Sequence, residues 1–383
     1  MSDCDVKEFK LCELLKIYNG TKYDHLNKGD IPLYGSGGLM SHVDEALYSG
    51  EAILLPRKGT LSNIMYVNES FWTVDTMYYA VVNDKLADAF YLYSYLSQLD
   101  LSNLDSGSTL PSMTKSAYES IVVKLPDLRI QKAVATILFN IRKKLETNNQ
   151  INQELEAMAK TLYDYWFVQF DYPDQNGKPY KSSGGKMVYN PELKREIPEG
   201  WGVSNLFDAA EVQYGYPFST DYFNSTGEGV PVIRIRDILG NDITNYSTEE
   251  VEDKYRINVG DVLIGMDGNF HMNYWIKENC YLNQRVVKVN SDKLPNMVLK
   301  YQIEPFIKLR EKSVSRTTVG HLSDKDLKAI NVILPKDKCL SSIFEKFESI
   351  LENIIINQQQ NQELTQLRDW LLPMLMNGQV KVE

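Results

Sequence analysis

The chain has 383 residues, which is too long for one domain of ordinary size and predicts two to four domains. Its hydrophobic content of 43% allows a large core, but no apolar run reaches the roughly 20 residues needed to cross a membrane. The net charge of -10 excludes DNA binding by bulk charge alone, because DNA affinity normally depends on Lys and Arg that neutralise phosphates. Such a chain would need locally clustered basic groups or a partner that supplies positive surface.

The N-terminal sequence and the cysteines predict a cytoplasmic protein. The first ten residues, MSDCDVKEFK, lack the apolar stretch of a signal peptide. The cysteines lie far apart and without paired spacing, at Cys4, Cys12, Cys280 and Cys339. This pattern indicates a reducing compartment, and neither a disulfide framework nor a zinc site is expected.

The first domain is expected to cover residues 1–128 and to contain a small sheet. β-Branched and aromatic runs at 52–55 and 77–82 predict strands between turns, and residues 87–99 are expected to be helical. Two loops combine basic and hydroxyl side chains with glycine, a mixture suited to contacts with phosphates and base edges. The candidate DNA-binding residues in these loops are Arg57, Lys58, Thr60, Ser108 and Thr109.

Residues 129–170 are predicted to form a long helix with a coiled-coil seam. From Val134 to Trp166 the seam residues recur alternately four and three apart, and Asn148 and Asn152 occupy two of these positions. A helix between these limits would be about 50 Å long at ~1.5 Å per residue. A polar connector at 171–199, rich in Gly, Lys and Pro, is expected to be a loop or an extended segment.

The second domain is expected to cover residues 200–336 and to resemble the first in class. Runs at 230–233 and 285–289 predict strands, and residues 295–312 are expected to be helical. Its loops offer further candidate DNA-binding residues, although each loop alone is more typical of a solvated turn. These residues are Arg234, Arg236, Asn269, His271, Gln284, Arg285, Arg316 and Thr317.

An internal repeat relates the two halves of the chain. The segment that ends at Pro126 recurs without a gap in the segment that ends at Pro335, so the offset in numbering is 335 − 126 = 209. The sequence NQEL at 152–155 recurs at 361–364 with the same offset. A looser match relates 50–54 to 260–264 at an offset of 210. Two motifs at one offset predict a duplicated architecture.

The second helix, expected at 337–383, repeats the seam with Asn357 and Asn361 at the equivalent positions. If the two helices pair in antiparallel fashion, Asn148 faces Asn361 and Asn152 faces Asn357. A buried Asn fixes register, because a slipped alignment would place its amide against apolar groups. A parallel pairing would also match Asn with Asn, and ordinary amphipathic core helices are the plainer alternative. We expect the antiparallel pair.

The sequence offers no convincing active site. It has no phosphate-binding loop with the Gly-Lys-Ser/Thr ending, no Gly-x-Ser-x-Gly turn, and no histidine spacing typical of a metal site. The glycine-rich segment at 34–38 is more typical of a flexible turn. Residues 190–192, Asn-Pro-Glu, fall short of the motif with which amino-methyltransferases hold a flipped adenine.

Four motifs together resemble the specificity subunits of type I restriction-modification systems over essentially the whole chain. They are TLPSMT at 109–114, VKLPDLRIQ at 123–131, LYDYWF at 162–167 and IPEGW at 197–201. The resemblance implies an α+β fold in which two target-recognition domains are separated by a long antiparallel two-helix coiled coil, with a pseudo-two-fold repeat. The second half departs from the pattern, with Val319-Gly320-His321 in place of Leu110-Pro111-Ser112.

The resemblance also implies a function without catalysis in this chain. A specificity subunit reads a bipartite double-stranded DNA target and docks two methyltransferase subunits and, through them, restriction and translocase subunits. S-adenosylmethionine, ATP and Mg²⁺ are expected on those partners, and neither a cofactor, a metal nor a membrane is expected for this chain. The alternatives are a coiled-coil scaffold that binds proteins but no DNA, which the acidic charge favours, and a self-contained restriction-methylation enzyme.

Overall fold

The computed structural model describes residues 6–101, 111–313, 320–335, 340–376 and 379. The chain forms two compact units, unit 1 with residues 1–145 and 364–383, and unit 2 with residues 146–363. Eight residues singled out in the sequence lie outside the described ranges: Cys4, Ser108, Thr109, Leu110, Arg316, Thr317, Val319 and Cys339. Within those ranges, no helix is both long and apolar enough to cross a membrane.

In its described part, unit 1 contains a six-stranded sheet in the order β2-β7-β5-β6-β3-β4 and a separate pair of β1 and β8. The strands are β1 (Lys7–Lys10), β2 (Leu15–Asn19), β3 (Lys28–Gly35), β4 (Gly38–Val43), β5 (Tyr48–Pro56), β6 (Met65–Thr73), β7 (Met77–Val82) and β8 (Val122–Leu125). The helices are α1 (Leu11–Leu14), α2 (Ala89–Leu96) and α3 (Lys115–Ser120). The predicted strands at 52–55 and 77–82 are confirmed, and the glycine-rich segment at 34–38 turns the chain between β3 and β4.

In its described part, unit 2 contains a four-stranded sheet, β12-β20-β17-β18, and a five-stranded sheet, β13-β15-β14-β19-β16. The strands of these sheets are β12 (Glu211–Tyr214), β13 (Phe223–Asn224), β14 (Val230–Ile233), β15 (Tyr246–Ser247), β16 (Arg256–Ile257), β17 (Val262–Gly265), β18 (Met272–Tyr274), β19 (Cys280–Leu282) and β20 (Val286–Asn290). The unit also contains β11 (Gly202–Asn205), which pairs with β21 (Asn331–Leu334), and the helices α5 (Leu206–Ala209), α6 (Asn296–Ser313) and α7 (Asp324–Lys328).

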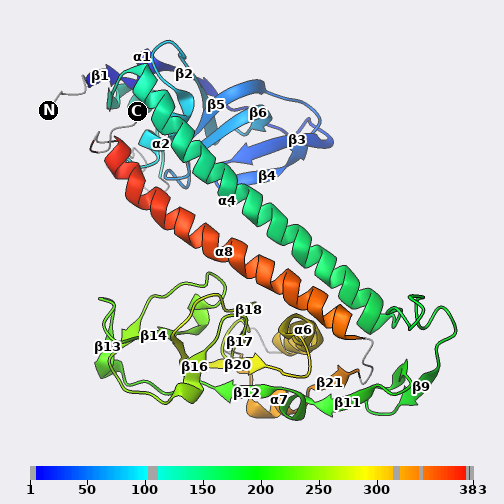
Figure 1. Ribbon diagram of the computed structural model, residues 1–383. Helices are drawn as coiled ribbons and strands as arrows, with labels where there is room; N and C mark the ends of the chain where they lie inside the picture. Colours follow the sequence, from blue (N-terminus) through cyan, green and yellow to red (C-terminus); the bar gives the residue numbers. More distant parts are fainter. Residues whose placement is uncertain (1–5, 102–110, 314–319, 336–339, 377–378, 380–383) are drawn as a thin grey trace. The chain divides into compact units, whose positions relative to one another are not determined.

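Two 36-residue helices, α4 (Leu128–Tyr163) and α8 (Ser341–Met376), have residues in both units. Within each unit they lie side by side and antiparallel (Figure 1). The first long helix was expected to begin at residue 129, and α4 begins at Leu128, where the Asp127 carboxylate accepts a hydrogen bond from the Ile130 amide at 3.1 Å. The end of α4 widens into a π-helical turn at Asp164–Val168.

The connector is more structured than the predicted loop. It contains a hairpin of β9 (Met187–Asn190) and β10 (Arg195–Pro198). Aromatic packing holds it in place, since the ring of Tyr172 stacks on Trp201 at a centroid distance of 5.0 Å. The Asp171 carboxylate accepts hydrogen bonds from Ser182, which lowers the pKa of that carboxyl.

The internal repeat holds for the backbone as well as the sequence, but with two offsets. In β5 and β7 Leu54 pairs with Tyr79, and Leu263 of β17 pairs with Lys288 of β20 in the same way. This register relates β5 to β17 by an offset of 209, so the sequence match at 210 was one position off. The first elements recur at an offset of 195, since β1 and α1 correspond to β11 and α5. The chain between the first and the later strands is therefore longer in the second half.

A glycine in each half shows how closely the two backbones agree. Gly20 follows β2 and Gly215 follows β12, again at an offset of 195. A Cβ atom on Gly20 would lie 2.0 Å from the carbonyl oxygen of Val74, and one on Gly215 would lie 1.9 Å from that of Asn283. Only glycine allows this close approach of two backbone segments.

Candidate nucleic-acid interface

Three segments of unit 1 meet where β5 ends, and we call this place the first loop junction. It comprises residues 56–60, 74–76 and 111–113. The amide of Gly59 donates to the Pro111 carbonyl at 3.0 Å, and that of Met113 donates to the Arg57 carbonyl at 3.0 Å. Arg57 donates its own amide to Thr76 at 2.8 Å. Backbone hydrogen bonds thus fix the path of the loop at 56–60.

The same arrangement recurs at the offset of 209 where β17 ends, and this is the second loop junction, residues 265–269, 283–285 and 320–322. The Gly268 amide donates to Gly320 at 2.9 Å, and the Leu322 amide donates to Met266 at 2.7 Å. Met266 in turn donates to the Arg285 carbonyl at 3.0 Å. Gly59 and Gly268 both have positive φ angles, 91° and 72°, which glycine adopts without steric cost.

The predicted residues of the first loop junction are accessible. Arg57, Lys58 and Thr60 are exposed. The Arg57 guanidinium lies 5.9 Å from the ring centroid of Tyr78, and its Nη1 donates to the Asp75 carbonyl at 3.4 Å. These contacts orient the Arg57 side chain while leaving it open to solvent. Lys58 is exposed beside Arg57, where a phosphate can reach its charge.

The second loop junction gathers several predicted residues that are distant in sequence. Asn269, Gln284 and Arg285 are exposed around the end of β17, and His271 is half-buried there. The 3₁₀ turn at Ile235–Asp237 lies beside them, because the Ile235 side chain contacts Gly265. Arg234 and Arg236 flank this side chain, so they lie near the second loop junction as well.

Arg234 and Arg236 differ in their surroundings. Arg236 is exposed, and its Nε lies 3.8 Å from the buried carboxylate of Asp237, whose pKa is raised by desolvation. Arg234 is half-buried, and its Nε and Nη2 atoms are buried without a hydrogen-bond partner in the described ranges. Unpartnered buried donors are costly, so the surroundings of Arg234 are the less favourable of the two without a ligand.

Two residues of the second loop junction were missed by sequence reasoning. The Asp267 carboxylate lies 2.7 Å from His321 Nδ1 and 3.3 Å from Arg285 Nε. His321 was noted only as a departure from the repeat, at the position of Ser112. The offset of 209 could have found the pair, since Asp267 falls opposite Lys58 and the two junctions are built alike.

The helix pair has the predicted antiparallel register. Asn148 donates to Asn361 Oδ1 at 2.9 Å, and Asn357 donates to Asn152 Oδ1 at 2.9 Å. The network extends further, because Asn361 donates to Asn149 and Asn152 donates to the Ile354 carbonyl. Asn148 and Asn152 are buried, so a shifted register would leave their amide groups without hydrogen-bond partners.

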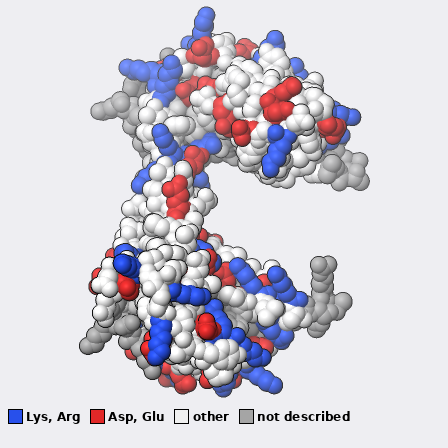
Figure 2. Space-filling view, turned by 90° about the vertical axis from the view of Figure 1, so that its right-hand side faces the viewer, with Lys and Arg blue, Asp and Glu red and all other residues white. Residues whose placement is uncertain are grey.

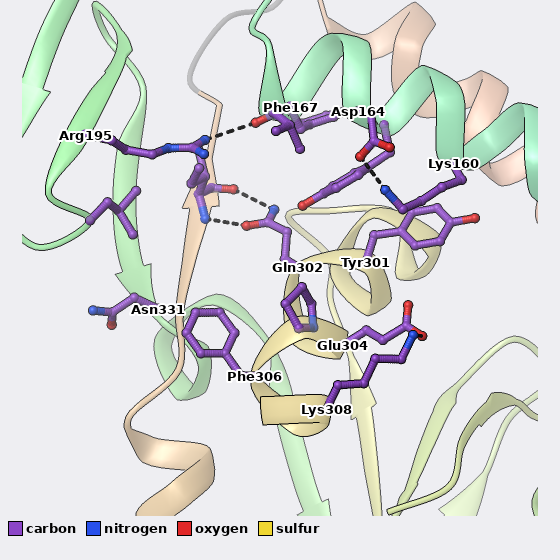
Figure 3. Close-up of a pocket in the computed structure, with 15 residues that line it drawn as sticks. Lys160, Asp164, Phe167, Arg195, Tyr301, Gln302, Glu304, Phe306, Lys308 and Asn331 are labelled. Atoms are coloured by element: carbon purple, nitrogen blue, oxygen red, sulfur yellow. Dashed lines mark hydrogen bonds and ion pairs between the residues drawn. The ribbon is translucent and has the colours of Figure 1, made fainter. Parts of the chain in front are cut away.

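A cavity of about 470 Å³ lies in unit 2 beside the π-helical turn (Figure 3). Its polar groups are engaged with one another: Lys160 pairs with Asp164, Arg195 donates to the Phe167 carbonyl at 3.2 Å, and Gln302 forms two hydrogen bonds with the backbone of Ile333. This arrangement joins the π-helical turn to β10 and joins α6 to β21. It does not place a nucleophile beside a base, so we assign it a structural role.

The surface of the helix pair is poor in charge. Residues 147–153 and 353–362 contain no charged side chain, and both stretches lie in unit 2. Ile151, Met158 and Ile356 are 41–47% exposed, which leaves apolar surface uncovered. On the face shown in Figure 2, Lys and Arg are interspersed with Asp and Glu in both units. No group of three His, Cys, Asp or Glu suited to a metal ion occurs among the described residues.

Comparisons with known proteins agree with this architecture. The family described as the type I restriction modification DNA specificity domain matches residues 4–157 and 198–366. The chain is similar to the type I restriction enzyme MjaIX specificity subunit of Methanocaldococcus jannaschii, with 27% identity over 297 residues, 74% of this chain and 66% of the relative. It is also similar to the type I restriction enzyme EcoBI specificity subunit of Escherichia coli, with 28% identity over 173 residues, 45% of this chain.

The chain spans about two thirds of the length of the first relative and 36% of the second. Among solved structures, the type I restriction-modification system S subunit from M. genitalium aligns with a TM-score of 0.68 at 15% identity, covering 98% of this chain and 97% of that one. This alignment shows a shared fold over nearly the whole chain, including the duplicated halves and the long helices.

Proposed function

The chain belongs to the family of type I restriction-modification DNA specificity subunits, which are non-catalytic, and on this premise we propose that it reads a bipartite DNA target. Unit 1 would read one half-site and unit 2 the other. The chain would also dock two methyltransferase subunits and, through them, restriction and translocase subunits. S-adenosylmethionine, ATP and Mg²⁺ would then act on the partner chains in the cytoplasm.

The observation that carries this proposal is the recurrence of the loop junction. Each half fixes an accessible polar loop with the same three backbone hydrogen bonds, related by the offset of 209, while the side chains on the two loops differ. A constant backbone with variable side chains is what two readers of different sequences require. Side chains that contact base edges specify sequence, whereas backbone and phosphate contacts set position.

We assign the DNA contacts to the predicted residues of the two junctions. The first half-site would be contacted by Arg57, Lys58 and Thr60, and the second by Arg234, Arg236, Asn269, His271, Gln284 and Arg285. Ser108, Thr109, Arg316 and Thr317 remain predictions. Since these residues carry local positive charge on an acidic chain, the methyltransferase partners would supply the rest of the positive surface around the DNA.

The helix pair is the proposed docking surface for the methyltransferase subunits. Its uncharged stretches and exposed apolar side chains have the composition of the core of a protein interface, which is depleted in charge. The pair would also act as a spacer between two short specific tracts. Because major-groove faces recur about every 34 Å, one added heptad in each of α4 and α8 is expected to change the preferred length of the nonspecific spacer.

The test uses the full chain purified with its methyltransferase subunit and a library of random DNA. We expect selection of two specific tracts separated by a nonspecific spacer. Arg57→Ala should weaken recognition of one half-site about ten-fold, because a base contact supplies about 1 to 3 kcal/mol, and should leave methyltransferase assembly intact. Lys85→Ala, an exposed cation outside the junction, is the matched control.

Three outcomes would contradict the proposal. A complex that binds the methyltransferase subunit but no DNA would favour the scaffold function. Methylation by the chain without any partner would make it an enzyme in its own right. Exchange of residues 1–128 for the corresponding segment of a relative should alter one half-site only, and a change in both would disprove independent reading and the proposed domain boundary at 128. The domain boundaries proposed at 170, 199 and 336 lie outside the exchanged segment.

A further inference from the structure

The two loop junctions share their backbone but have opposite charges at one position. Lys58 in the first junction corresponds to Asp267 in the second, Ser112 corresponds to His321, and Thr76 corresponds to Arg285. The first junction therefore presents a cation, whereas the second places a carboxylate between two groups that can carry positive charge. Both junctions keep the same backbone hydrogen bonds, so the fold does not require either set of side chains.

Asp267 lies beneath the two side chains that it contacts. The side chains of Arg285 and His321 are 53% and 50% exposed, while that of Asp267 is 30% exposed. Oδ1 of Asp267 lies 2.7 Å from His321 Nδ1, and Oδ2 lies 3.3 Å from Arg285 Nε. One carboxylate thus restrains an arginine and a histidine from different loops.

These contacts leave defined groups available to a ligand. Because Asp267 engages the Nε atom of Arg285, the planar guanidinium is oriented with Nη1 and Nη2 unpartnered in the described part of the chain. The two Nη donors match two neighbouring acceptors. In the major groove guanine alone presents such a pair, O6 and N7.

We propose that Asp267 is the positioning residue of the second reader, holding Arg285 to contact a guanine in the second half-site, with His321 beside it. The inference rests on the proposed function and adds a base identity to it. A phosphate would also bind the arginine fork, but it would do so without regard to sequence. Base preference therefore distinguishes the two contacts.

The experiment compares variants of the full chain, each assembled with its methyltransferase subunit, on the random DNA library. Asp267→Ala and Arg285→Lys are each expected to reduce the preference for guanine at one position of the second half-site about ten-fold, the discrimination of a bidentate contact. Asp267→Asn, whose amide oxygen still accepts from His321, should have an intermediate effect. Asp292→Asn, an exposed acid outside the junction, is the matched control.

Each outcome decides between the possibilities. Loss of guanine preference in the second half-site, with the first half-site and methyltransferase assembly unchanged, supports the inference. A uniform loss of affinity across all sequences identifies a phosphate contact and overturns it, as does an unchanged second half-site. If the unsubstituted complex selects no bipartite target, both the proposed function and the inference are wrong. If it selects a bipartite target without guanine in the second half-site, only the inference is wrong.

Discussion

The first half of the molecule joins its long strands in one sheet, whereas the second half divides the equivalent strands between two sheets. In unit 1, β6 runs unbroken from Met65 to Thr73 and pairs with both β5 and β3. Its counterpart in unit 2 is interrupted between β18 and β19, where Trp275 is completely buried and Asn279 has a positive φ angle of 57°. The junction survives this change, so the backbone that presents the loops is maintained while the sheet behind it varies.

The cores of the two sheets differ in charge as well. Lys288 in β20 is buried, lies 4.0 Å from Asp261 and 3.6 Å from Glu211, and donates to the Arg256 carbonyl. At the positions equivalent to Lys288 and Asp261, unit 1 has Tyr79 and Ala52. One half therefore stabilises its sheet with apolar and aromatic packing, and the other half accommodates a buried ion pair in the same place.

The largest expected effect tests the shared backbone. Gly20→Ala and Gly215→Ala should each destabilise their own unit by more than about 3 kcal/mol, because the added Cβ would overlap a backbone carbonyl in both. Hydrogen exchange read by peptide would locate each loss. Gly37→Ala, whose Cβ meets no atom within 4 Å, should be almost neutral. A large loss of stability at only one of the two glycines would contradict the structural equivalence of the two backbones.

A smaller effect tests the difference in buried charge. Desolvation raises the pKa of Asp261 to about 6, above its ordinary value near 3.8. The folded state then binds this proton more tightly than the unfolded state, so the stabilisation is present at low pH and is lost as pH rises through about 6. We expect the free energy of unfolding, relative to Asp261→Asn, to fall by about 2 kcal/mol between pH 4 and pH 7.

Urea unfolding of the full chain across this pH range measures the effect. The equivalent residue in unit 1 is Ala52, which does not titrate, so the change should be confined to unit 2. A difference between the two proteins that stays constant or rises with pH would show that attraction by Lys288 outweighs desolvation at Asp261.

The smallest effect concerns the helices that connect the repeats. Asn357→Leu removes the donor to Asn152 Oδ1 and should cost about 1 kcal/mol in urea unfolding, since Asn357 is half-buried and water can replace part of the bond. The double variant Asn152→Leu with Asn357→Leu should recover that loss, because two leucines can pack where two amides paired. Equal destabilisation by the single and double variants would argue against a direct pair.

Sequence reasoning predicted most of what depends on local pattern and repetition. The heptad spacing, together with the expected antiparallel direction, predicted the facing of Asn148 with Asn361, because a seam with two polar positions has few registers that match amide to amide. The strand at 77–82 and the helix near 295–312 followed from composition and turn residues. The π-helical turn at Asp164–Val168 was not predicted, since a wider helical turn leaves no mark on the spacing of the seam.

The loop junctions were decided by tertiary structure. Asp267, Arg285 and His321 are distant from one another in sequence, and no local pattern joins them. They meet because the end of β17, the turn between β19 and β20, and the segment before α7 converge on one backbone arrangement, whose geometry depends on long-range hydrogen bonds. The sequence alone determined that the chain is duplicated and that asparagines occupy the same two seam positions in both helices, whereas the structure decided between the antiparallel and the parallel pairing. Only the fold determined which side chains of each half stand together, since that depends on strand pairing between distant segments.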